Sequence, residues 1–470
     1  MLKLKKFGFL LGPLLFLVLH LAGGSLLYTT LGVAAWMVSW WITEAVSISV
    51  TALLPLVLFP IFGVFDFAKV ASSYGHKIIF LFMGGFIIAL AMEKWNLHKR
   101  IALSIIGYTG SSATGILLGF MLATAGISMW ISNTATAVMM LPIAVSVNEI
   151  IGRANENNPV LKKFSLALFL GIAYAANIGG IATIIGTPPN AVLASVLSSQ
   201  LDIELGFAQF MMVGVPTAVI MLFVTYRVLG AGLRKQIEFV DIQPIIREEK
   251  KKLGKLGKEE AIVLIVFVLT AMMWIFRNPI NSLFGVTILD DYIISMAGGI
   301  AMFTIPSSFK DGKHILVWED TKKLPWGILI LFGGGLALAG AMEHSGVIAA
   351  ISTWIEHLNY SHLGIYMLIL ITISLFLTEV MSNVALTTIF IPLVLGICSG
   401  LGANAVHFAI PAALAASFAF MLPVSTPPNA IVFSSGQVTI GQMVRKGIIL
   451  NVIGVVLLWL VGMFLLPILY

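Results

Sequence analysis

Long apolar runs, most of them about the length of one membrane crossing, follow one another along the 470 residues of this chain. A transmembrane helix needs about 20 consecutive, predominantly apolar residues. Eleven runs are interpreted as crossings; they lie near residues 8–27, 29–45, 47–65, 77–95, 164–198, 209–230, 260–277, 288–305, 325–343, 407–434 and 447–468. The pattern therefore predicts an all-α polytopic membrane protein with eleven transmembrane helices.

Two further apolar stretches, 113–147 and 363–398, are about 35 residues long, which is too long for one crossing. Each carries a Ser-Asn pair in its middle, Ser132-Asn133 in the first and Ser382-Asn383 in the second. Each stretch either crosses twice or dips into the membrane and returns. Irregular backbone is tolerated at that depth where protein buries it or where it lines a cavity, and we treat both stretches as re-entrant hairpins.

Several motifs occur twice along the chain. Three motifs recur 250 positions later: Leu81–Gly85 as Leu331–Gly335, Met92-Glu93 as Met342-Glu343, and Ser132-Asn133 as Ser382-Asn383. A fourth recurs at an offset of 239: Gly186–Asn190 as Ser425–Asn429. The number of crossings between the copies makes them face opposite ways, so the sequence predicts an inverted repeat, as found in many transporters.

Composition supports a membrane protein and excludes a soluble one. The chain is 59% hydrophobic and 10% charged, with a mean hydropathy of +1.02, whereas soluble domains carry about 25% charged residues. A net charge of +6 is compatible with nucleic-acid binding, but the positive charges sort by membrane side. We therefore expect no nucleic-acid partner.

Positive charges gather on the cytoplasmic side of membrane proteins, and this rule fixes the orientation. With the N-terminus in the cytoplasm, 24 of the 27 Lys and Arg residues fall inside, and Lys69, Lys77 and Arg277 fall outside. Hairpins that cross twice give the same sidedness, so the charges do not settle hairpin depth. We expect a multi-pass protein of the plasma (inner) membrane with an external C-terminus.

The hydrophilic block around residues 231–259 divides the chain into three parts. Residues 1–230 hold the first repeat with hairpin 113–147, and residues 260–470 hold the second repeat with hairpin 363–398. The charged residues between them predict a cytoplasmic linker.

Four polar patches interrupt the apolar stretches and are the candidate binding residues. They are Ser132-Asn133-Thr134, Ser382-Asn383-Val384, Thr187-Pro188-Pro189-Asn190 and Thr426-Pro427-Pro428-Asn429. Consecutive prolines break a helix; the break frees carbonyls for cations and leaves a helix N-terminus for anions. One Ser, Thr or Pro in a membrane helix usually serves packing, but four patches in two symmetric pairs predict a binding site at the middle of the membrane.

Charge is almost absent from the stretches 113–147, 164–198, 363–398 and 408–434, in which Glu379 is the sole Asp, Glu, Lys, Arg or His. An anion bound there has no Lys or Arg partner in those stretches, and burying an unpaired charge is costly. A small cation such as Na⁺, bound by oxygens of the broken helices, would offset that charge. Glu379 could carry a proton, sit near the cation, or serve as a hydrogen-bonded structural acid; the sequence leaves these roles open.

The duplicated Ser-Asn-Thr-type and Thr-Pro-Pro-Asn motifs together resemble the divalent anion:sodium symporter family, whose members carry dicarboxylates, citrate or sulfate. The resemblance runs from about residue 30 to the C-terminus, and Ser132–Ala137 look like the sodium-coupled branch. It implies a homodimer in which a scaffold domain holds a mobile transport domain that moves as an elevator.

The resemblance also implies roles for individual residues. Substrate carboxylates would meet Ser132, Asn133, Thr134, Thr187, Pro188, Ser382, Asn383, Thr426 and Pro427. One sodium ion would bind at Ser128, Ser132, Asn133 and Gly186, and a second at Thr378, Met381, Asn383 and Ser425. Val384 departs from the family motif, which has Thr there, so the two half-sites are unequal.

We therefore expect a sodium-coupled symporter of C4 dicarboxylates (succinate, malate or fumarate), with membrane lipid and a second copy of the chain as further partners. The alternative is a sodium-independent anion exchanger of the same fold. An enzyme is not expected: a serine hydrolase needs a base such as His beside its nucleophile, and none of the four patches contains His.

Overall fold

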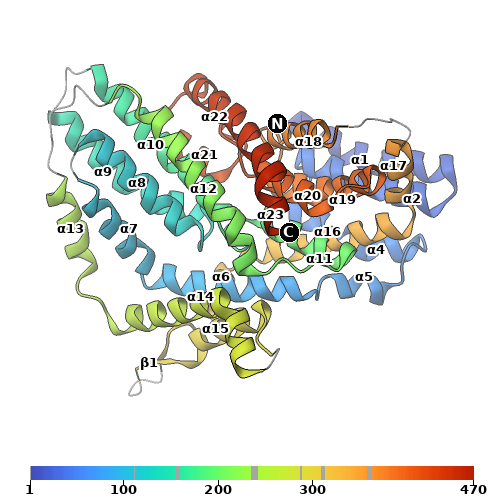
Figure 1. The fold of residues 1–470 in the computed structure, drawn as a ribbon, viewed down its shortest axis with the longest axis horizontal. Helices are drawn as coiled ribbons and strands as arrows, with labels where there is room; N and C mark the ends of the chain where they lie inside the picture. Colours follow the sequence, from blue (N-terminus) through green and yellow to red (C-terminus); the bar gives the residue numbers. More distant parts are fainter. Residues whose placement is uncertain are drawn as a thin grey trace.

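A computed structural model describes residues 2–110, 112–154, 159–233, 242–285, 288–308, 313–356 and 362–470. These residues are almost entirely helical (Figure 1). The helices are α1 (Leu2–Gly23), α2 (Leu26–Thr43), α3 (Ile48–Thr51), α4 (Leu54–Ile61), α5 (Phe67–Ser73), α6 (Lys77–Lys94), α7 (Leu97–Tyr108), α8 (Ala113–Ser128), α9 (Asn133–Ala154), α10 (Pro159–Gly180), α11 (Pro188–Leu201), α12 (Phe207–Gly230), α13 (Gln243–Leu253), α14 (Lys258–Phe284), α15 (Asp291–Thr304), α16 (Trp326–His344), α17 (Val347–Glu356), α18 (Leu363–Leu377), α19 (Asn383–Leu401), α20 (Ala405–Ala415), α21 (Pro427–Ser434), α22 (Ile440–Leu460) and α23 (Leu466–Leu469).

Two short elements, η1 (Trp318–Lys323) and η2 (Val461–Leu465), and two antiparallel strands, β1 (Pro306–Ser308) and β2 (Lys313–His314), complete the described structure. Ten helices in the described ranges are long and apolar enough to cross a membrane. The all-helical membrane class is thus confirmed, whereas the count of eleven crossings and the depth of the hairpins stay predictions. The expected crossing at 47–65 is two short helices, because the chain turns at Ala52 just before Pro55, which has no N–H to donate.

Both long apolar stretches fold as two helices joined by a tight turn at the Ser-Asn pair. In the first, α8 ends at Ser128 and α9 begins at Asn133. The Ser132 Oγ accepts a hydrogen bond of 3.2 Å from the Ala135 N–H, which caps α9. In the second, α18 ends at Leu377 and α19 begins at Asn383. The Ser-Asn pairs predicted to bind ligands therefore stand at the start of a helix in both hairpins.

Each Thr-Pro-Pro-Asn motif breaks its helix, and the two pieces then separate. Irregular backbone at 181–187 divides α10 from α11, and irregular backbone at 416–426 divides α20 from α21. The piece after each break packs against the other half of the chain: α11 lies on α16, α19 and α20, whereas α21 lies on α9 and α10 (Figure 1). In the folded protein, therefore, the second piece of each broken helix lies among helices of the other half of the chain.

The repeated Gly-Gly motif allows close helix packing at equivalent places in both halves. A Cβ at Gly84 of α6 would lie 2.4 Å from the Ser295 carbonyl oxygen of α15. A Cβ at Gly334 of α16 would lie 2.2 Å from the Ala52 carbonyl oxygen. The glycine motif that recurs 250 positions later in the sequence thus corresponds to two close backbone contacts, each of which a larger residue would prevent.

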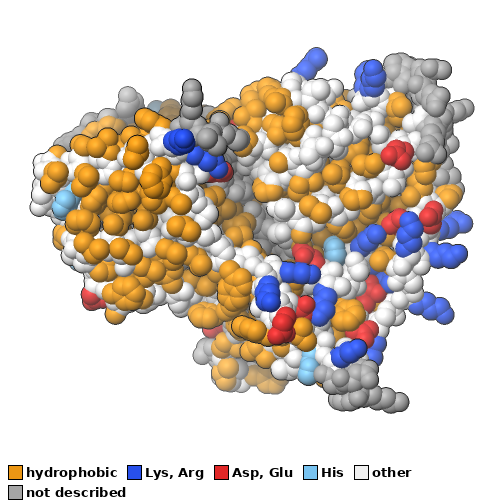
Figure 2. Space-filling model, turned by 180° about the vertical axis from the view of Figure 1, so that it is seen from behind, with side chains coloured by type: hydrophobic (Ala, Val, Ile, Leu, Met, Phe, Trp, Pro, Cys, Tyr) orange, Lys and Arg blue, Asp and Glu red, His pale blue; other side chains and the backbone are white. Residues whose placement is uncertain are grey.

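Charged side chains gather over α7, α13 and the start of α14, whereas the opposite lobe of that face is mostly hydrophobic (Figure 2). Arg100 pairs with Glu260 at 2.5 Å and also donates to the Gly254 carbonyl just after α13. Lys99 pairs with Glu249 of α13 at 2.9 Å. The predicted linker 231–259 therefore contains a helix held against α7; its residues 234–241 lie outside the described ranges.

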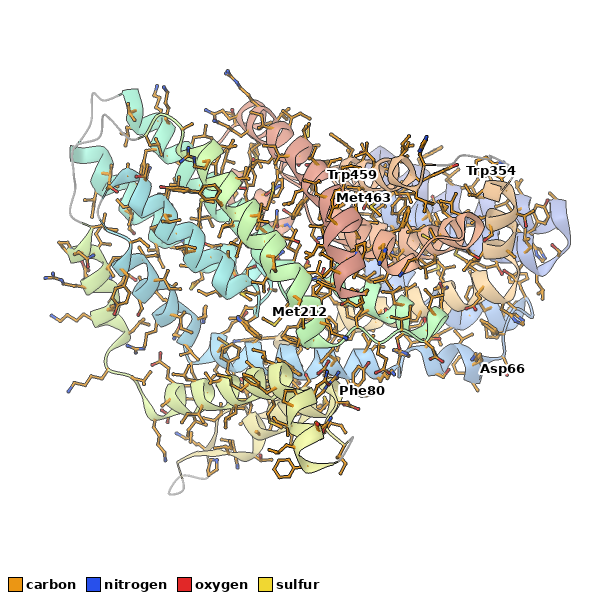
Figure 3. The ribbon with its side chains drawn as sticks, viewed as in Figure 1. Asp66, Phe80, Met212, Trp354, Trp459 and Met463 are labelled. Carbon is orange, nitrogen blue, oxygen red and sulfur yellow. The ribbon has the colours of Figure 1, made fainter. Side chains whose placement is uncertain are left out.

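A third ion pair joins the end of α6 to η1. Lys94 contacts Asp320 of η1 at 2.6 Å. Burial raises the pKa of Asp320, but hydrogen bonds from Lys94 and from the Val317 N–H outweigh it, so the net pKa is lowered. Elsewhere large apolar side chains such as Phe80, Met212 and Trp354 are exposed (Figure 3), as expected for helices that face lipid.

We expect Gly84→Ala and Gly334→Ala each to destabilise the fold, because overpacking against fixed backbone costs about 1–3 kcal/mol. The matched control is Gly126→Ala, where a Cβ meets nothing within 4 Å and alanine favours the helix. Thermal unfolding of the detergent-solubilised protein measures the difference. A Gly334→Ala variant as stable as the Gly126→Ala variant would contradict the packing described here.

Candidate functional site

A cavity of about 920 Å³ lies where the two hairpin turns meet the two broken helices. All nine residues predicted to contact substrate line it: Ser132, Asn133, Thr134, Thr187, Pro188, Ser382, Asn383, Thr426 and Pro427. These residues come from α9, α11, α19, α21 and the segments just before them. The chain therefore brings together four patches that are up to about 300 residues apart in sequence.

The residues predicted to bind sodium divide into two groups. Six of them line the cavity: Ser132, Asn133, Gly186, Met381, Asn383 and Ser425. Ser128 and Thr378 do not; both are fully buried. Ser128 Oγ lies 2.7 Å from Asn133 Oδ1 and 2.8 Å from the Ala176 carbonyl, and Thr378 Oγ1 donates to the Ala416 carbonyl at 2.6 Å.

Two asparagines hold the broken backbone in equivalent ways. The Asn190 amide donates to the carbonyls of Gly180 and Thr183, at 3.2 and 2.7 Å. The Asn429 amide donates to the carbonyls of Ala419 and Leu422, at 3.0 and 3.1 Å. In both cases the acceptors lie ten and seven residues before the asparagine. The last residue of each Thr-Pro-Pro-Asn motif thus fixes the loop that precedes the motif, which the sequence did not reveal.

Glycines allow the first half-site to close around Asn133. A Cβ at Gly180 would lie 2.5 Å from Asn133 Oδ1, and a Cβ at Gly186 would lie 2.4 Å from the Gly180 carbonyl oxygen. The absence of side chains at these positions lets the Asn133 side chain and the irregular backbone approach the end of α10. Glycine here is required for close approach and not for an unusual backbone angle.

Thr187 and Thr426 stand immediately before α11 and α21 with the same extended backbone, at φ −145° and −142°. Neither hydroxyl caps its own helix. Both helices begin at the cavity with a Pro-Pro pair, which has no N–H to donate. The positive end of each helix dipole and the threonine hydroxyl beside it therefore face the cavity. Helix N-termini favour negative charge, so the arrangement suits an anion with two separated charges.

Glu379 is buried and fixes the second loop. Its carboxylate accepts hydrogen bonds from the N–H groups of Phe420, Met421 and Leu422, at 2.8 to 3.1 Å, and from the Asn451 amide at 2.7 Å. Within the described part of the chain all of its partners are donors, so a carboxyl proton has no acceptor. Of the three roles left open by the sequence, this geometry favours a fixed structural anion.

The sequence missed several cavity-lining residues. Asn177 of α10 lines the cavity and was overlooked, although it is a lone amide in an apolar run. Lys5, Glu44, Glu93 and Lys323 also line it. The expectation that an anion meets no Lys or Arg thus holds for the hairpins and broken helices but is wrong for the cavity wall, because helices distant in sequence contribute to it. Lys5 lies 3.6 Å from Glu44.

The donor set suits Na⁺ better than a transition metal. Among the described residues no group of three or more His, Cys, Asp or Glu side chains is placed to hold a metal ion. Hydroxyl, amide and backbone carbonyl oxygens surround the cavity instead, and such oxygen ligands suit hard cations.

Comparison with known proteins gives consistent results. Residues 24–470 match the family described as the sodium:sulfate symporter transmembrane region. Two relatives named sodium-dependent dicarboxylate transporter SdcS, from Staphylococcus saprophyticus and Staphylococcus aureus, are 40% identical to the chain, and each alignment covers 98% of this chain and 91% of the relative.

Two solved structures share the fold. The Alcanivorax borkumensis YdaH transporter has a TM-score of 0.58 at 11% identity, covering 84% of this chain and 87% of that one. Neisseria gonorrhoeae MtrF has a TM-score of 0.55 at 9% identity, covering 84% and 83%. At such identities the likeness concerns the fold alone.

We expect Glu379→Gln to destabilise the protein. The amide nitrogen of Gln cannot accept the hydrogen bonds that the second carboxylate oxygen accepts from backbone N–H groups. Leaving buried donors without partners costs about 1–3 kcal/mol. Asn451→Ala is the graded comparison: it removes the side-chain partner and keeps the hydrogen bonds from the three backbone N–H groups. Thermal unfolding should rank the parent above Asn451→Ala and Asn451→Ala above Glu379→Gln; the reverse order of the two variants would refute the structural role.

Proposed function

The chain belongs to the sodium:sulfate symporter family, the divalent anion:sodium symporters that its motifs resemble, and from that membership we propose that it transports C4 dicarboxylates together with Na⁺. The observation that carries the proposal is the cavity in which both pairs of polar patches meet. The relatives named sodium-dependent dicarboxylate transporters support the same substrate class.

Two carboxylates of succinate, malate or fumarate match two half-sites. One carboxylate would meet Ser132, Asn133, Thr134, Thr187 and Pro188, and the other Ser382, Asn383, Thr426 and Pro427. Each half-site offers hydroxyl and amide donors and one helix N-terminus. Neutral donors of this kind stabilise an anion without an ion pair, which lets it leave again during transport.

Sodium ions would supply the positive charge that the half-sites lack. We propose one ion at Ser128, Ser132, Asn133 and the Gly186 carbonyl, and a second at Thr378, Met381, Asn383 and Ser425. Ser128 and Asn133 already contact each other, so a cation there would act on an amide that also faces the cavity. Binding of cation and anion would then be cooperative in both directions.

The cavity would open toward the cytoplasm. Its charged lining residues, Lys5, Glu44, Glu93 and Lys323, all fall on the side that the positive-inside rule assigns to the cytoplasm. The transport domain would move as an elevator against the scaffold domain within a homodimer, as the family resemblance implies. The exchange of α11 and α21 between halves supports this motion, because rocking one half against the other would separate the residues of the site.

Uptake of radiolabelled succinate into proteoliposomes, with and without a sodium gradient, tests the proposal. We expect Ser128→Ala and Thr378→Ala to raise the sodium concentration for half-maximal uptake more than they lower the maximal rate. The control is Ser146→Ala, whose hydroxyl bonds its own helix outside the cavity lining. Parent uptake that ignores sodium but responds to internal dicarboxylate would favour the sodium-independent exchanger.

Val384 lines the cavity beside Asn383, where the family motif has Thr. We expect Val384→Thr to change succinate affinity about two- to tenfold, since a net buried hydrogen bond contributes about 0.5–1.5 kcal/mol. Competition of unlabelled succinate, malate and sulfate against labelled succinate measures affinity and selectivity together. Identical competition curves for parent and variant would show that this side chain does not reach the bound anion.

A further inference from the structure

Asn177 connects the first broken helix to the second at the cavity. It lies on α10, is 1% exposed, and lines the cavity. Its side-chain nitrogen donates to the Ala419 carbonyl at 3.2 Å and to Thr426 Oγ1 at 3.0 Å, and it lies 3.5 Å from Asn429 Oδ1. One amide of the first half therefore contacts both the loop and the Thr-Pro-Pro-Asn motif of the second half.

These contacts fix the direction of the hydrogen bond to Thr426. The Ala419 carbonyl only accepts, so the Asn177 nitrogen must face it, and the same nitrogen then donates to Thr426 Oγ1. The threonine hydroxyl is left with its own proton. Within the described residues that proton has no acceptor, although Thr426 lines the cavity and is 4% exposed. The hydroxyl is thus prepared to donate to a ligand in the cavity.

The first half lacks this arrangement. The offset of 239 that relates Thr187 to Thr426 and Asn190 to Asn429 places Ala416 opposite Asn177. Consistent with that substitution, Thr187 Oγ1 and Asn190 Oδ1 are buried and have no hydrogen-bond partner among the described residues. Two acceptors that Asn177 contacts in one half-site are therefore left without a partner in the other.

We propose that Asn177 is a positioning residue for the substrate: by donating to Thr426, it commits the Thr426 hydroxyl proton to one carboxylate of the bound dianion. The Ala416 position gives Thr187 no such partner. The two carboxylates are therefore held unequally, more firmly at the Thr426 end. The inference rests on the proposed dicarboxylate function. It adds a positioning residue and a difference in strength between the two carboxylate sites.

The test compares Asn177→Asp with Asn177→Ala in sodium-driven fumarate uptake by proteoliposomes. Fumarate is the probe because it stays doubly ionised at mildly acidic pH. In Asn177→Ala the hydroxyl loses its donor and can rotate; we expect the KM to rise about three- to tenfold, the effect of one net hydrogen bond. In Asn177→Asp the ionised carboxylate accepts the Thr426 proton and repels the substrate, so we expect a larger rise of KM.

Acidification should separate the two variants. A protonated carboxyl group at position 177 again donates to Thr426, so the KM of Asn177→Asp should fall toward the parent value as pH decreases. The KM of Asn177→Ala should stay above the parent value at every pH, because alanine has no group to protonate. Glu379 and Tyr174 also bond the loop at 420–422, but both are present in every variant, and their effect cancels in the comparison.

Ala416→Asn is the mirror variant, because it offers an amide to Thr187 and Asn190. We expect this variant to lower the KM or leave it unchanged. Because position 416 is buried, thermal unfolding checks that the larger asparagine side chain does not destabilise the fold. If the parent takes up no fumarate with sodium, the proposed function and this inference both fail. If the parent transports but Asn177→Asp and Asn177→Ala share one KM at every pH, the inference alone is overturned.

Discussion

The structure depends on satisfying the backbone hydrogen bonds that the two broken helices lose in a region where little water is available. Every carbonyl or N–H left without a partner in an apolar environment is costly. Asn190 and Asn429 donate to the carbonyls of the two loops, and Glu379 accepts the N–H groups of the second. Once these bonds hold the loops, the helix N-termini, the threonine hydroxyls and the hairpin turns have fixed places around one cavity.

The two halves share this framework but not its chemistry. The amide contacts of Asn190 and Asn429 are equivalent, whereas Met129 occupies the position of Glu379 and Ala416 that of Asn177. In the first half, the Met129 carbonyl accepts a hydrogen bond from Thr183 at 2.5 Å; in the second, a carboxylate organises the loop. A duplicated fold has therefore kept its geometry while the groups that face the ligand and support the loops have diverged.

The sequence predicted what local chemistry determines. Prolines break helices wherever they occur in pairs, and a Ser-Asn pair inside a long apolar run indicates a turn, so the positions of both hairpins and both breaks follow from the sequence. The exchange of α11 and α21 between the halves does not, because it depends on packing between residues about 240 positions apart. For the same reason Lys5, Lys323 and Asn177 were not recognised as neighbours of the site, and the 47–65 run was taken for one helix.

The exchange of helix pieces also constrains how the protein is made. Helices α9 and α10 leave the ribosome long before α21, the eight-residue helix that packs against them. Contacts so distant in sequence form late, and chain entropy must be overcome before they stabilise anything. During synthesis the first hairpin therefore enters the bilayer before α21, which packs against it in the folded protein, has been made. A chain that stops before residue 427 lacks the helix that packs against α9 and α10, so its first hairpin cannot reach the packing of the folded protein.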